Sequence, residues 1–343
     1  INCGGTLGSY ATLTNNGTLL FNGTLEDGGR VINNNTGQAV LQFGTGNDAL
    51  YLNGDSVTLA GLTADGGAGS NTLGFTRYES GTWTNGLSGS TAFTNFDTFT
   101  VKSGSRWNFG GSNTITAGDV LNVNGGFQNY GTLTVSGYMH NTGTFGRAFS
   151  GTASGVTLAN GGTLNNSGRI QRTDIGVVGT GTGNTLINSG YIFGSTGTAV
   201  QFGSGNDLLQ INTGASFNGT VDGGTGTDVL EFVTGNGGTL TNSFIGFETA
   251  TVDSGASWVL GGNSTFGTIN DFGVLANTGT ITTTSAFNAG GTFNGTLVNG
   301  TVINAGTIIG NTGTAIQFGA GDDLLQIKTG AKFTGIVDGG AGT

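Results

Sequence analysis

The sequence predicts an all-β protein, a single right-handed parallel β-helix (β-solenoid) of roughly 15 turns, and three observations lead to this prediction. One ten-residue stretch recurs three times at long intervals, at residues 43–52, 202–211 and 318–327. Short runs that alternate apolar with polar residues, bounded by Gly or Asn, follow one another along the chain, and no stretch has helical periodicity. The composition combines 72 Gly with no Pro in 343 residues.

The recurring stretch reads Phe-Gly-x-Gly, then Asn or Asp, then Asp, and it continues with four mainly apolar residues. An Asp-Gly-Gly turn follows each copy and begins at Asp65, Asp222 and Asp338. Fixed internal periods of this kind indicate a solenoid and not a set of separate globular cores. We therefore expect one continuous β-helix over residues 1–343. Its repeat modules lie approximately at residues 31–185, 186–301 and 302–343.

The missing proline fits this fold. Almost every strand of a parallel β-helix is paired on both sides, so a residue without an N–H would break a ladder nearly anywhere. Gly, at about three times its ordinary share, recurs in Asn-x-Gly turns. Asn and Gly tolerate the left-handed backbone that a sharp corner needs, so we expect corners at these turns, with the next apolar residue pointing inward. The turns begin at Asn129, Asn141, Asn166, Asn188, Asn277 and Asn304.

The spacing of equivalent residues gives the length of one coil. Asp207 and Asp228 are 21 residues apart, and Asp48 and Asn71 are 23 apart. Coils of this length would stack about 4.8 Å apart. Inward Leu, Ile, Val and Phe would form the core, while Thr, Ser and Asn would cover the outside and bond along the solenoid axis.

The formal net charge of −10 is unevenly distributed. Residues 1–97 carry −5, residues 98–173 carry +4, and residues 174–343 carry −9. The basic middle is the first place to look for an anionic partner. Nucleic acid is not expected as that partner, because both flanks are acidic.

The basic middle supplies the predicted ligand-binding residues. They are Lys102, Arg106, Tyr138, Arg147, Arg169 and Arg172, with Trp107, Tyr130 and Phe149 nearby in sequence. Arg beside aromatic rings suits sulfated or carboxylated glycans, through bidentate contacts and stacking. Arg147 and Arg169 are 22 residues apart, close to one coil, so they could stack on one face. The simpler interpretation is that these are solvated charges that keep the protein soluble.

Two further runs carry a family resemblance. Residues 315–325 read Ala-Ile-Gln-Phe-Gly-Ala-Gly-Asp-Asp-Leu-Leu, and residues 252–258 read Val-Asp-Ser-Gly-Ala-Ser-Trp. With these runs and its Asn-x-Gly-Thr-Ile turns, the chain resembles the passenger region of a bacterial type V autotransporter of the AIDA-like adhesin type, over essentially its whole length. The resemblance implies a right-handed β-helix on the bacterial cell surface, attached to the outer membrane through a C-terminal barrel outside this sequence, or secreted.

The same resemblance implies a function in virulence without a defined ligand. It implies an adhesin that binds a host glycan, a matrix or receptor protein, or further copies of itself between bacteria. Cys3 is the single cysteine, so no internal disulfide is expected. The chain begins at Ile1 and ends within the third Asp-Gly-Gly repeat, so we expect it to be a fragment of a longer precursor.

Enzymatic activity is not expected, and no catalytic residue is predicted. The only histidine is His140, and the best match to a serine-protease nucleophile motif, Gly-Asp-Ser-Val at residues 54–57, lacks the final Gly. A polysaccharide-active β-helix enzyme would need clustered carboxylates, but Asp228 and Glu231, three residues apart on one strand, point to opposite faces. That enzyme class stays an alternative, as does a secreted factor that acts on a host receptor.

Calcium is the one metal that the motifs suggest. The Gly-x-Gly-x-Asp-x-Leu pieces are similar to half of the calcium-binding nonapeptide of secreted RTX proteins, and Asp207 and Asp228 would lie on neighbouring turns. The simpler interpretation is that each Asp closes its turn with a side-chain to backbone hydrogen bond. The Asn71 that replaces Asp228 in the first copy favours this interpretation, so no metal or cofactor is expected.

Overall fold

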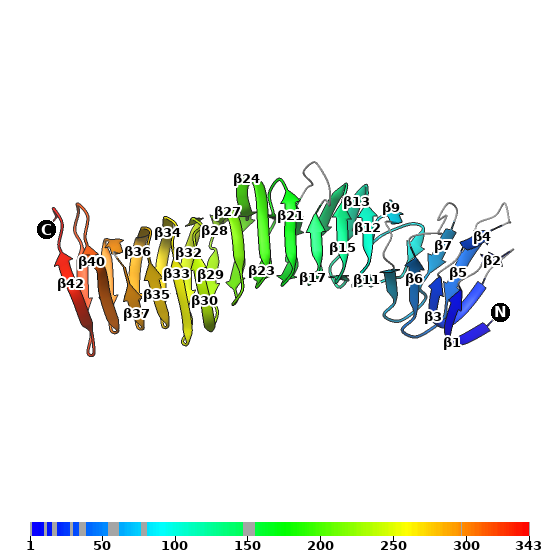
Figure 1. The fold of residues 1–343 in the computed structure, drawn as a ribbon, viewed down its shortest axis with the longest axis horizontal. Coiled ribbons are helices and arrows are strands. Elements are labelled where there is room, and N and C mark those ends of the chain that lie inside the picture. The colour runs from blue at the N-terminus through cyan, green and yellow to red at the C-terminus, as the bar shows by residue number, and fades with distance from the viewer. Residues whose placement is uncertain are drawn as a thin grey trace. The chain divides into compact units, whose positions relative to one another are not determined.

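The structure is a computed structural model. It describes residues 2–9, 12–15, 19–27, 30–33, 39–53, 62–76, 81–146, 155–295 and 297–342. The described residues form 42 strands and no helix, and every pairing between them is parallel (Figure 1). They stack as a β-solenoid of about 13 turns, which confirms the predicted fold class. The count is slightly below the predicted one. The coils are unequal in length, since register partners lie 15 residues apart at Phe287 and Val302 but 26 apart at Leu73 and Phe99.

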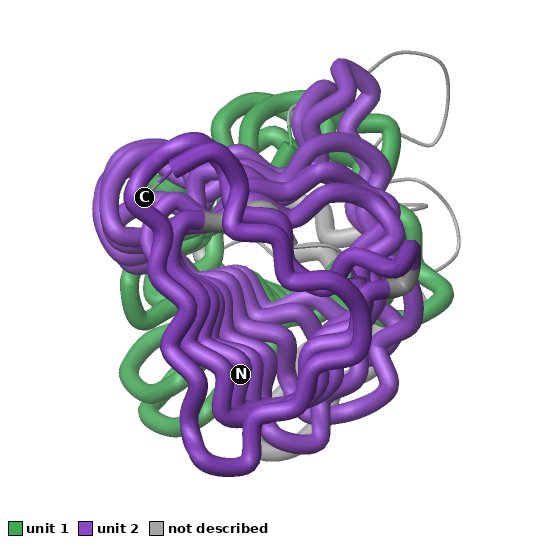
Figure 2. The backbone as a smooth tube through the Cα atoms, turned by 90° about the vertical axis from the view of Figure 1, so that its left-hand side faces the viewer, with its two compact units in different colours: residues 1–157, 162–173 green, residues 158–161, 174–343 purple. Residues whose placement is uncertain are grey.

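Two compact units divide the chain. Unit 1 consists of Ile1–Thr157 and Gly162–Thr173, and unit 2 consists of Leu158–Gly161 and Asp174–Thr343. Figure 2 views the backbone nearly end-on and shows the coils of unit 2 nested one behind another. Within the described ranges, no helix is long and apolar enough to span a membrane.

Unit 1 contains two long stacks of parallel strands. The first stack runs through β6, β8, β11, β14, β17 and β20, and the second runs through β9, β12, β15, β18 and β21. The strands of this unit are β1 (Asn2–Ser9), β2 (Thr12–Asn15), β3 (Leu19–Asp27), β4 (Arg30–Asn33), β5 (Ala39–Phe43), β6 (Ala49–Asn53), β7 (Leu62–Asp65), β8 (Thr72–Thr76), β9 (Gly81–Trp83), β10 (Phe93–Thr94), β11 (Thr98–Val101), β12 (Arg106–Phe109), β13 (Ser112–Ile115), β14 (Val120–Val123), β15 (Gly126–Asn129), β16 (Thr132–Val135), β17 (Tyr138–Asn141), β18 (Thr144–Gly146), β20 (Thr163–Asn166) and β21 (Arg169–Thr173). The division between the units falls within β19 (Val156–Ala159).

Unit 2 uses longer strands that turn corners and so contribute to more than one stack. They include β24, β34, β36 and β40, each of which pairs with two or more others. The strands of this unit are β22 (Val177–Thr180), β23 (Thr185–Asn188), β24 (Tyr191–Gln201), β25 (Ser204–Gly205), β26 (Leu208–Ile211), β27 (Ser216–Asp222), β28 (Thr225–Gly226), β29 (Val229–Phe232), β30 (Gly235–Leu240), β31 (Phe244–Ile245), β32 (Phe247–Val252), β33 (Ala256–Leu260), β34 (Ser264–Asp271), β35 (Val274–Asn277), β36 (Ile281–Ala289), β37 (Thr292–Asn294), β38 (Leu297–Asn299), β39 (Thr301–Asn304), β40 (Thr307–Gln317), β41 (Leu324–Ile327) and β42 (Lys332–Asp338).

The alternating sequence pattern places every second side chain in the core. On the first stack of unit 1, Leu121 is opposite Met139 and Met139 is opposite Leu164, and all three are fully buried. Their strand neighbours point outward, as the period of two requires. Each coil therefore adds one rung to a continuous apolar column.

Aromatic side chains fill the core of unit 1. Phe75 makes edge-to-face contacts at 5.1 Å with Trp83, Trp107 and Phe109. Phe109 in turn stacks on Phe127 at 3.9 Å. Each Trp donates its indole N–H to a main-chain oxygen, Trp107 to that of Thr76 at 3.1 Å, so burial leaves no polar group of these rings unpaired.

The Asn-x-Gly turns form corners as predicted, but the reason for their glycine differs from the prediction. None of these glycines has the left-handed backbone. At five of the six turns, a Cβ atom on the glycine would instead collide with a main-chain oxygen of the preceding coil, as at Gly168, where it would meet the oxygen of Gly143. In four of the turns the Asn side chain accepts the N–H of the glycine and so closes the turn, for example Gly279 N–H to Asn277 Oδ1 at 2.9 Å. Glycine is therefore required by the close approach of two coils.

We expect Gly168→Ala to destabilise unit 1 by about 1–3 kcal/mol, because the added methyl group meets a backbone oxygen that cannot move without breaking the ladder. The midpoint of urea unfolding measures the effect. Gly110→Ala is the control, since a Cβ there has its closest neighbour at 3.4 Å, an ordinary contact. Equal midpoints for the two variants would contradict the role assigned to Gly168.

Candidate functional site: a basic trough in unit 1

The outward side of the second stack of unit 1 has an arginine at each end of a short row. Arg106 on β12 is opposite Gly126, Gly126 is opposite Thr144, and Thr144 is opposite Arg169. Parallel strands lie about 4.8 Å apart, so the main chains of the two arginines are about 14 Å apart. Between them Gly126 has no side chain and Thr144 has a short one. Long side chains therefore project from the two ends of the row, and the middle of the row is a depression.

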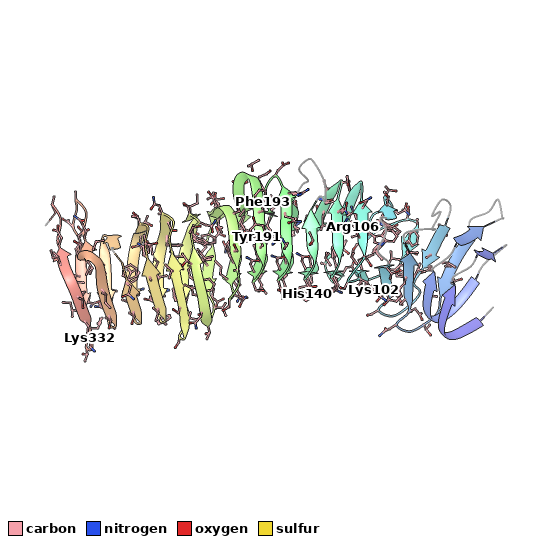
Figure 3. All side chains as sticks on the ribbon, in the orientation of Figure 1. Lys102, Arg106, His140, Tyr191, Phe193 and Lys332 are labelled. Carbon is pink, nitrogen blue, oxygen red and sulfur yellow. The ribbon has the colours of Figure 1, made fainter. Side chains whose placement is uncertain are left out.

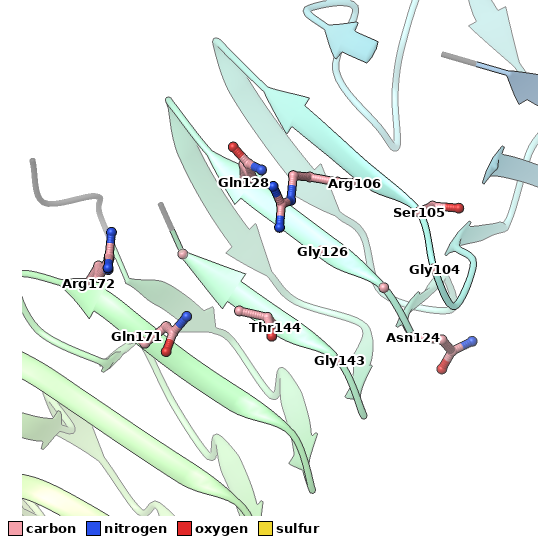
Figure 4. A pocket seen from close by; sticks show the side chains of 12 residues that line it. Gly104, Ser105, Arg106, Asn124, Gly126, Gln128, Gly143, Thr144, Gln171 and Arg172 are labelled. Atoms are coloured by element: carbon pink, nitrogen blue, oxygen red, sulfur yellow. The ribbon is translucent and has the colours of Figure 1, made fainter. Parts of the chain in front are cut away.

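A cavity of about 460 Å³ occupies this low middle (Figure 4). It is lined by Gly104, Ser105, Arg106, Asn124, Gly125, Gly126, Gln128, Gly143, Thr144, Gly146, Gln171 and Arg172. These residues are called the basic trough from here on. They include two arginines, three side-chain amides and two hydroxyls, and they include no acidic residue. Such a lining offers hydrogen-bond donors and positive charge to a ligand.

Arg172 reaches the trough through an unusual backbone conformation. Its φ of 55° lies in the left-handed region, which a residue other than Gly or Asn enters at a cost of about 1–2 kcal/mol. The left-handed step interrupts the alternation of β21, so that Arg172 is exposed where the pattern after the buried Ile170 would place an inward residue, and Thr173 is buried instead. Backbone outliers of this kind concentrate at binding and catalytic sites. The outlier therefore marks the trough independently of its charge.

Arg169 lies beside the trough and does not line it. Its Nε donates to Oε1 of Gln171 at 3.3 Å, and Gln171 is a lining residue. On the far side Tyr130 OH contacts Oε1 of the buried Gln128 at 3.5 Å. These two contacts orient the amides that face the ligand space.

Two of the predicted ligand-binding residues lie elsewhere in unit 1. Lys102 follows β11 in the first stack, and its Nζ lies 3.6 Å from the centre of the Tyr51 ring, an attractive cation–π contact. Tyr138 on β17 is also in the first stack, between Val120 and Thr163. Figure 3 shows Lys102 along the lower edge of the ribbon, away from Arg106. Trp107, predicted as an aromatic neighbour, is a core residue and is 1% exposed.

The predicted stacking of Arg147 on Arg169 rested on a 22-residue coil. The residue opposite Arg169 on the preceding coil is Thr144, 25 residues earlier, so the spacing used in that prediction does not apply here. Arg147 and Phe149 lie outside the described residues.

Sequence reasoning missed the uncharged part of the trough. Asn124, Gln128, Thr144 and Gln171 line it, and the glycines of its floor keep it open. The signal that could have found part of it is the strand register, because Thr144 is opposite Arg169 and Gln171 is opposite Gly146 once the coils are aligned.

The protease candidates do not form a site in the described structure. His140 on β17 lies between Asn122 and Asn165 on the outward side of the first stack. Residues 54–57 lie outside the described residues.

The calcium candidates form a ladder of hydrogen bonds to the main chain. Asp207 Oδ1 accepts the N–H of Asn184 at 2.7 Å, and Asp228 Oδ1 accepts the N–H of Asp207 at 2.8 Å. Glu248 Oε2 continues the series by accepting the N–H of Asp228 at 2.6 Å. Each side chain thus bonds an amide of the preceding coil and not one of its own turn. The expected side-chain to backbone bond is present, but its partner differs from the predicted one.

The Asp-Gly-Gly residues do close their own turns. Asp222 Oδ1 accepts the N–H of Gly224 at 2.9 Å, and Asp65 and Asp338 make the equivalent bonds. Over the described ranges, His, Cys, Asp and Glu form no group of three or more that could hold a metal ion.

Burial raises the pKa of carboxyl groups in this ladder of hydrogen bonds. The pKa of Asp228 is raised to about 6, mainly because burial disfavours its charged form. The hydrogen bond from Asp207 N–H lowers the pKa, while the negative charges of Asp207, Glu248 and Asp222 raise it further. Desolvation also raises the pKa of Asp207. Asp253 has a raised pKa, first through burial and then through the charge of Glu231.

Asp271 is the acidic counterpart of the Asn residues in the Asn-x-Gly turns. Its Oδ1 accepts the N–H of Gly273 at 3.1 Å, and among the described residues its buried Oδ2 has no hydrogen-bond partner. The side chain is fully buried, and this burial raises its pKa to about 7 despite the bond from Gly273. A carboxyl group therefore stands where the neighbouring corners have a neutral amide.

Comparisons with models of protein families, with curated proteins and with solved structures gave no match to this chain. The fold and the trough define the class instead: the chain is a parallel β-solenoid with a basic, donor-rich trough on one outward face.

We expect Asp271→Asn to raise the stability of the protein at about pH 8 and to leave it nearly unchanged at about pH 4.5. The folded protein binds this proton more tightly than the unfolded chain, so stability falls as the pH rises from about 4 to about 7. The gain at high pH is on the order of a few kcal/mol. Urea unfolding at both pH values measures it.

The reverse substitution, Asn277→Asp, serves as the matched control in unit 2. It places a carboxyl group in an equivalent buried turn. The stability of this variant should therefore be lower than that of the natural sequence at high pH and should recover on acidification. If Asp271→Asn were no more stable than the natural sequence at about pH 8, the assignment of Asp271 as a destabilising buried acid would be wrong.

Proposed function

We propose that this chain is a non-enzymatic binding protein, an adhesin that holds sulfated or carboxylated glycan chains in the basic trough of unit 1. The observation that carries the proposal is the trough itself, with Arg106 and Arg172 on its walls, amides between them and no acidic residue in its lining. Guanidinium groups bind carboxylates and sulfates through paired, charge-assisted hydrogen bonds.

The shape of the trough supports an extended ligand. The row from Arg106 to Arg169 spans about 14 Å of strand spacing, a length that accommodates several sugar units. The glycine floor lets a chain-like ligand approach the main chain closely. Donors that repeat along a rigid solenoid suit binding of a repeating polyanion by many moderate contacts.

The charge distribution favours binding of a polyanionic ligand to one part of the chain. Residues 98–173 carry +4, while residues 174–343 carry −9. A polyanion is attracted to the basic part and repelled by the acidic part, and this contrast sets where it binds.

A bacterial surface or secreted location completes the proposal. The support for it is the resemblance of the repeats to autotransporter passengers, together with the single cysteine and the absence of proline. A host glycan, a matrix or receptor protein, or a second copy of the chain is the partner that such a location implies.

We expect the full chain to bind immobilised heparin, with affinity that falls between about 0.05 and about 0.5 M NaCl because the contacts are ionic. Arg106→Gln/Arg172→Asn should bind at least about tenfold more weakly, since each lost charge-assisted hydrogen bond costs about 1.5–3 kcal/mol. Asn at position 172 also suits the left-handed backbone. Surface plasmon resonance on heparin and on desulfated heparin measures both effects.

The matched control is Lys102→Gln/Lys328→Gln, which removes the same two charges outside the trough. It should retain nearly full binding. If both double variants lost the same heparin affinity, the effect would come from net charge alone, and the trough would not be the binding site. No heparin binding at low salt would contradict the proposed ligand class, and sedimentation of the same sample would then test self-association.

A further inference from the structure

A pair of aromatic rings stands on the outward side of β24 in unit 2. Tyr191 and Phe193 are both half-buried, while Ile192 between them is fully buried. Their ring centres are 6.4 Å apart and their planes differ by 29°, so the rings lie nearly parallel along the strand. Figure 3 shows the two side chains on the same strand. They form an apolar platform on the outward side of β24.

A shallow trough begins next to this platform. Phe193 is opposite Asn218 on β27, and beyond this pair the register breaks. β24 has four residues, 194–197, where β27 has only Gly219, so the extra residues of β24 project outward. Thr196 fixes the projection through two hydrogen bonds to the oxygen of Asp174, at 2.8 and 3.1 Å.

The trough has a volume of about 370 Å³ and is lined by Phe217, two glycines and small polar side chains. Its lining includes Gly197 of the projection, Asn218 and Thr220 of β27, and Asn242. The Nδ2 of Asn242 donates to the oxygens of Phe217 and Gly219, at 3.1 and 2.7 Å, which fixes the plane of this amide. The described residues that line the trough carry no charge, and they offer amide and hydroxyl groups to a ligand.

The third repeat shows that the fold does not need the aromatic pair. β40 pairs with β42 through the same register break, between Ile309 and Thr314. Yet Thr307 and Ile309 stand where Tyr191 and Phe193 stand in the second repeat, and the flanking sequences are nearly identical. The projection therefore forms without the rings, and the rings need an explanation other than folding.

We propose that Tyr191, Phe193 and the adjoining trough form a binding site for a neutral pyranose unit of an oligosaccharide. A pyranose has an apolar face of C–H groups, which packs on aromatic rings, and a rim of hydroxyls, which exchange hydrogen bonds with amides and hydroxyls. Asn218, Thr220 and Asn242 supply those groups. The site is independent of the basic trough of unit 1, and its ligand class differs.

The test uses the full chain on an array of uncharged cello-, malto-, galacto- and N-acetylglucosamine oligosaccharides, followed by calorimetry with the sugar that binds best. Tyr191→Thr/Phe193→Ile installs the residues of the third repeat, so its circular dichroism and unfolding midpoint should stay unchanged. We expect its affinity to fall at least tenfold. Asn218→Ala, at an exposed position, should weaken binding while the platform is intact.

The affinity for the neutral sugar should not depend on salt, and it should be unchanged in Arg106→Gln/Arg172→Asn. These two results would distinguish this site from the basic trough of unit 1. The proposal is overturned if no uncharged oligosaccharide binds, or if Tyr191→Thr/Phe193→Ile binds as well as the natural sequence. It is equally overturned if the arginine variant abolishes the binding, since the sugar would then occupy the basic trough.

Discussion

Main-chain hydrogen bonding between consecutive coils is the interaction on which the rest of this structure depends. No coil has a core of its own, so each is stable only through the ladder and the apolar column that it shares with its neighbours. The ladder demands strand spacing of about 4.8 Å even at the corners. Gly168 and its counterparts satisfy this demand by having no Cβ. Asp207 and Asp228 satisfy it in another way, because they accept amide protons of the preceding coil.

A backbone that is so constrained leaves function to the outward side chains and to the few places where the regular path is interrupted. The basic trough has one such interruption, the left-handed Arg172. The aromatic platform has another, the projecting residues 194–197 of β24. In both places the interruption redirects side chains without disturbing the buried column beneath them, since Ile170 and Ile192 are fully buried. A solenoid can therefore change its ligand at little cost to its fold.

The fold was predictable from the sequence because its signals are local and repeated. Alternation in strands such as Thr98–Val101 gives the inward and outward faces directly. The site was predictable only in part. Arg106 and Arg172 were identified by charge, but Lys102 and Tyr138 were grouped with them although they lie on another stack. Sequence distance converts into spatial proximity only when coil length is constant, and here register partners lie between 15 and 29 residues apart. Tyr191 and Phe193 carry no charge signal and stand out only when the second and third repeats are compared.

The charge of unit 2 shows why a count of acidic residues is a poor guide to its surface. Asp207, Asp228 and Asp271 are each 1% exposed or less, and their carboxyl groups face main-chain amides inside the solenoid. Burial raises the pKa of all three, to about 6 for Asp228 and about 7 for Asp271. Three of the 11 carboxyl groups of residues 174–343 are thus internal, and that of Asp271, with a pKa of about 7, is partly protonated near neutral pH. This is how an uncharged trough, suited to a neutral sugar, can lie on a unit that is strongly acidic by composition.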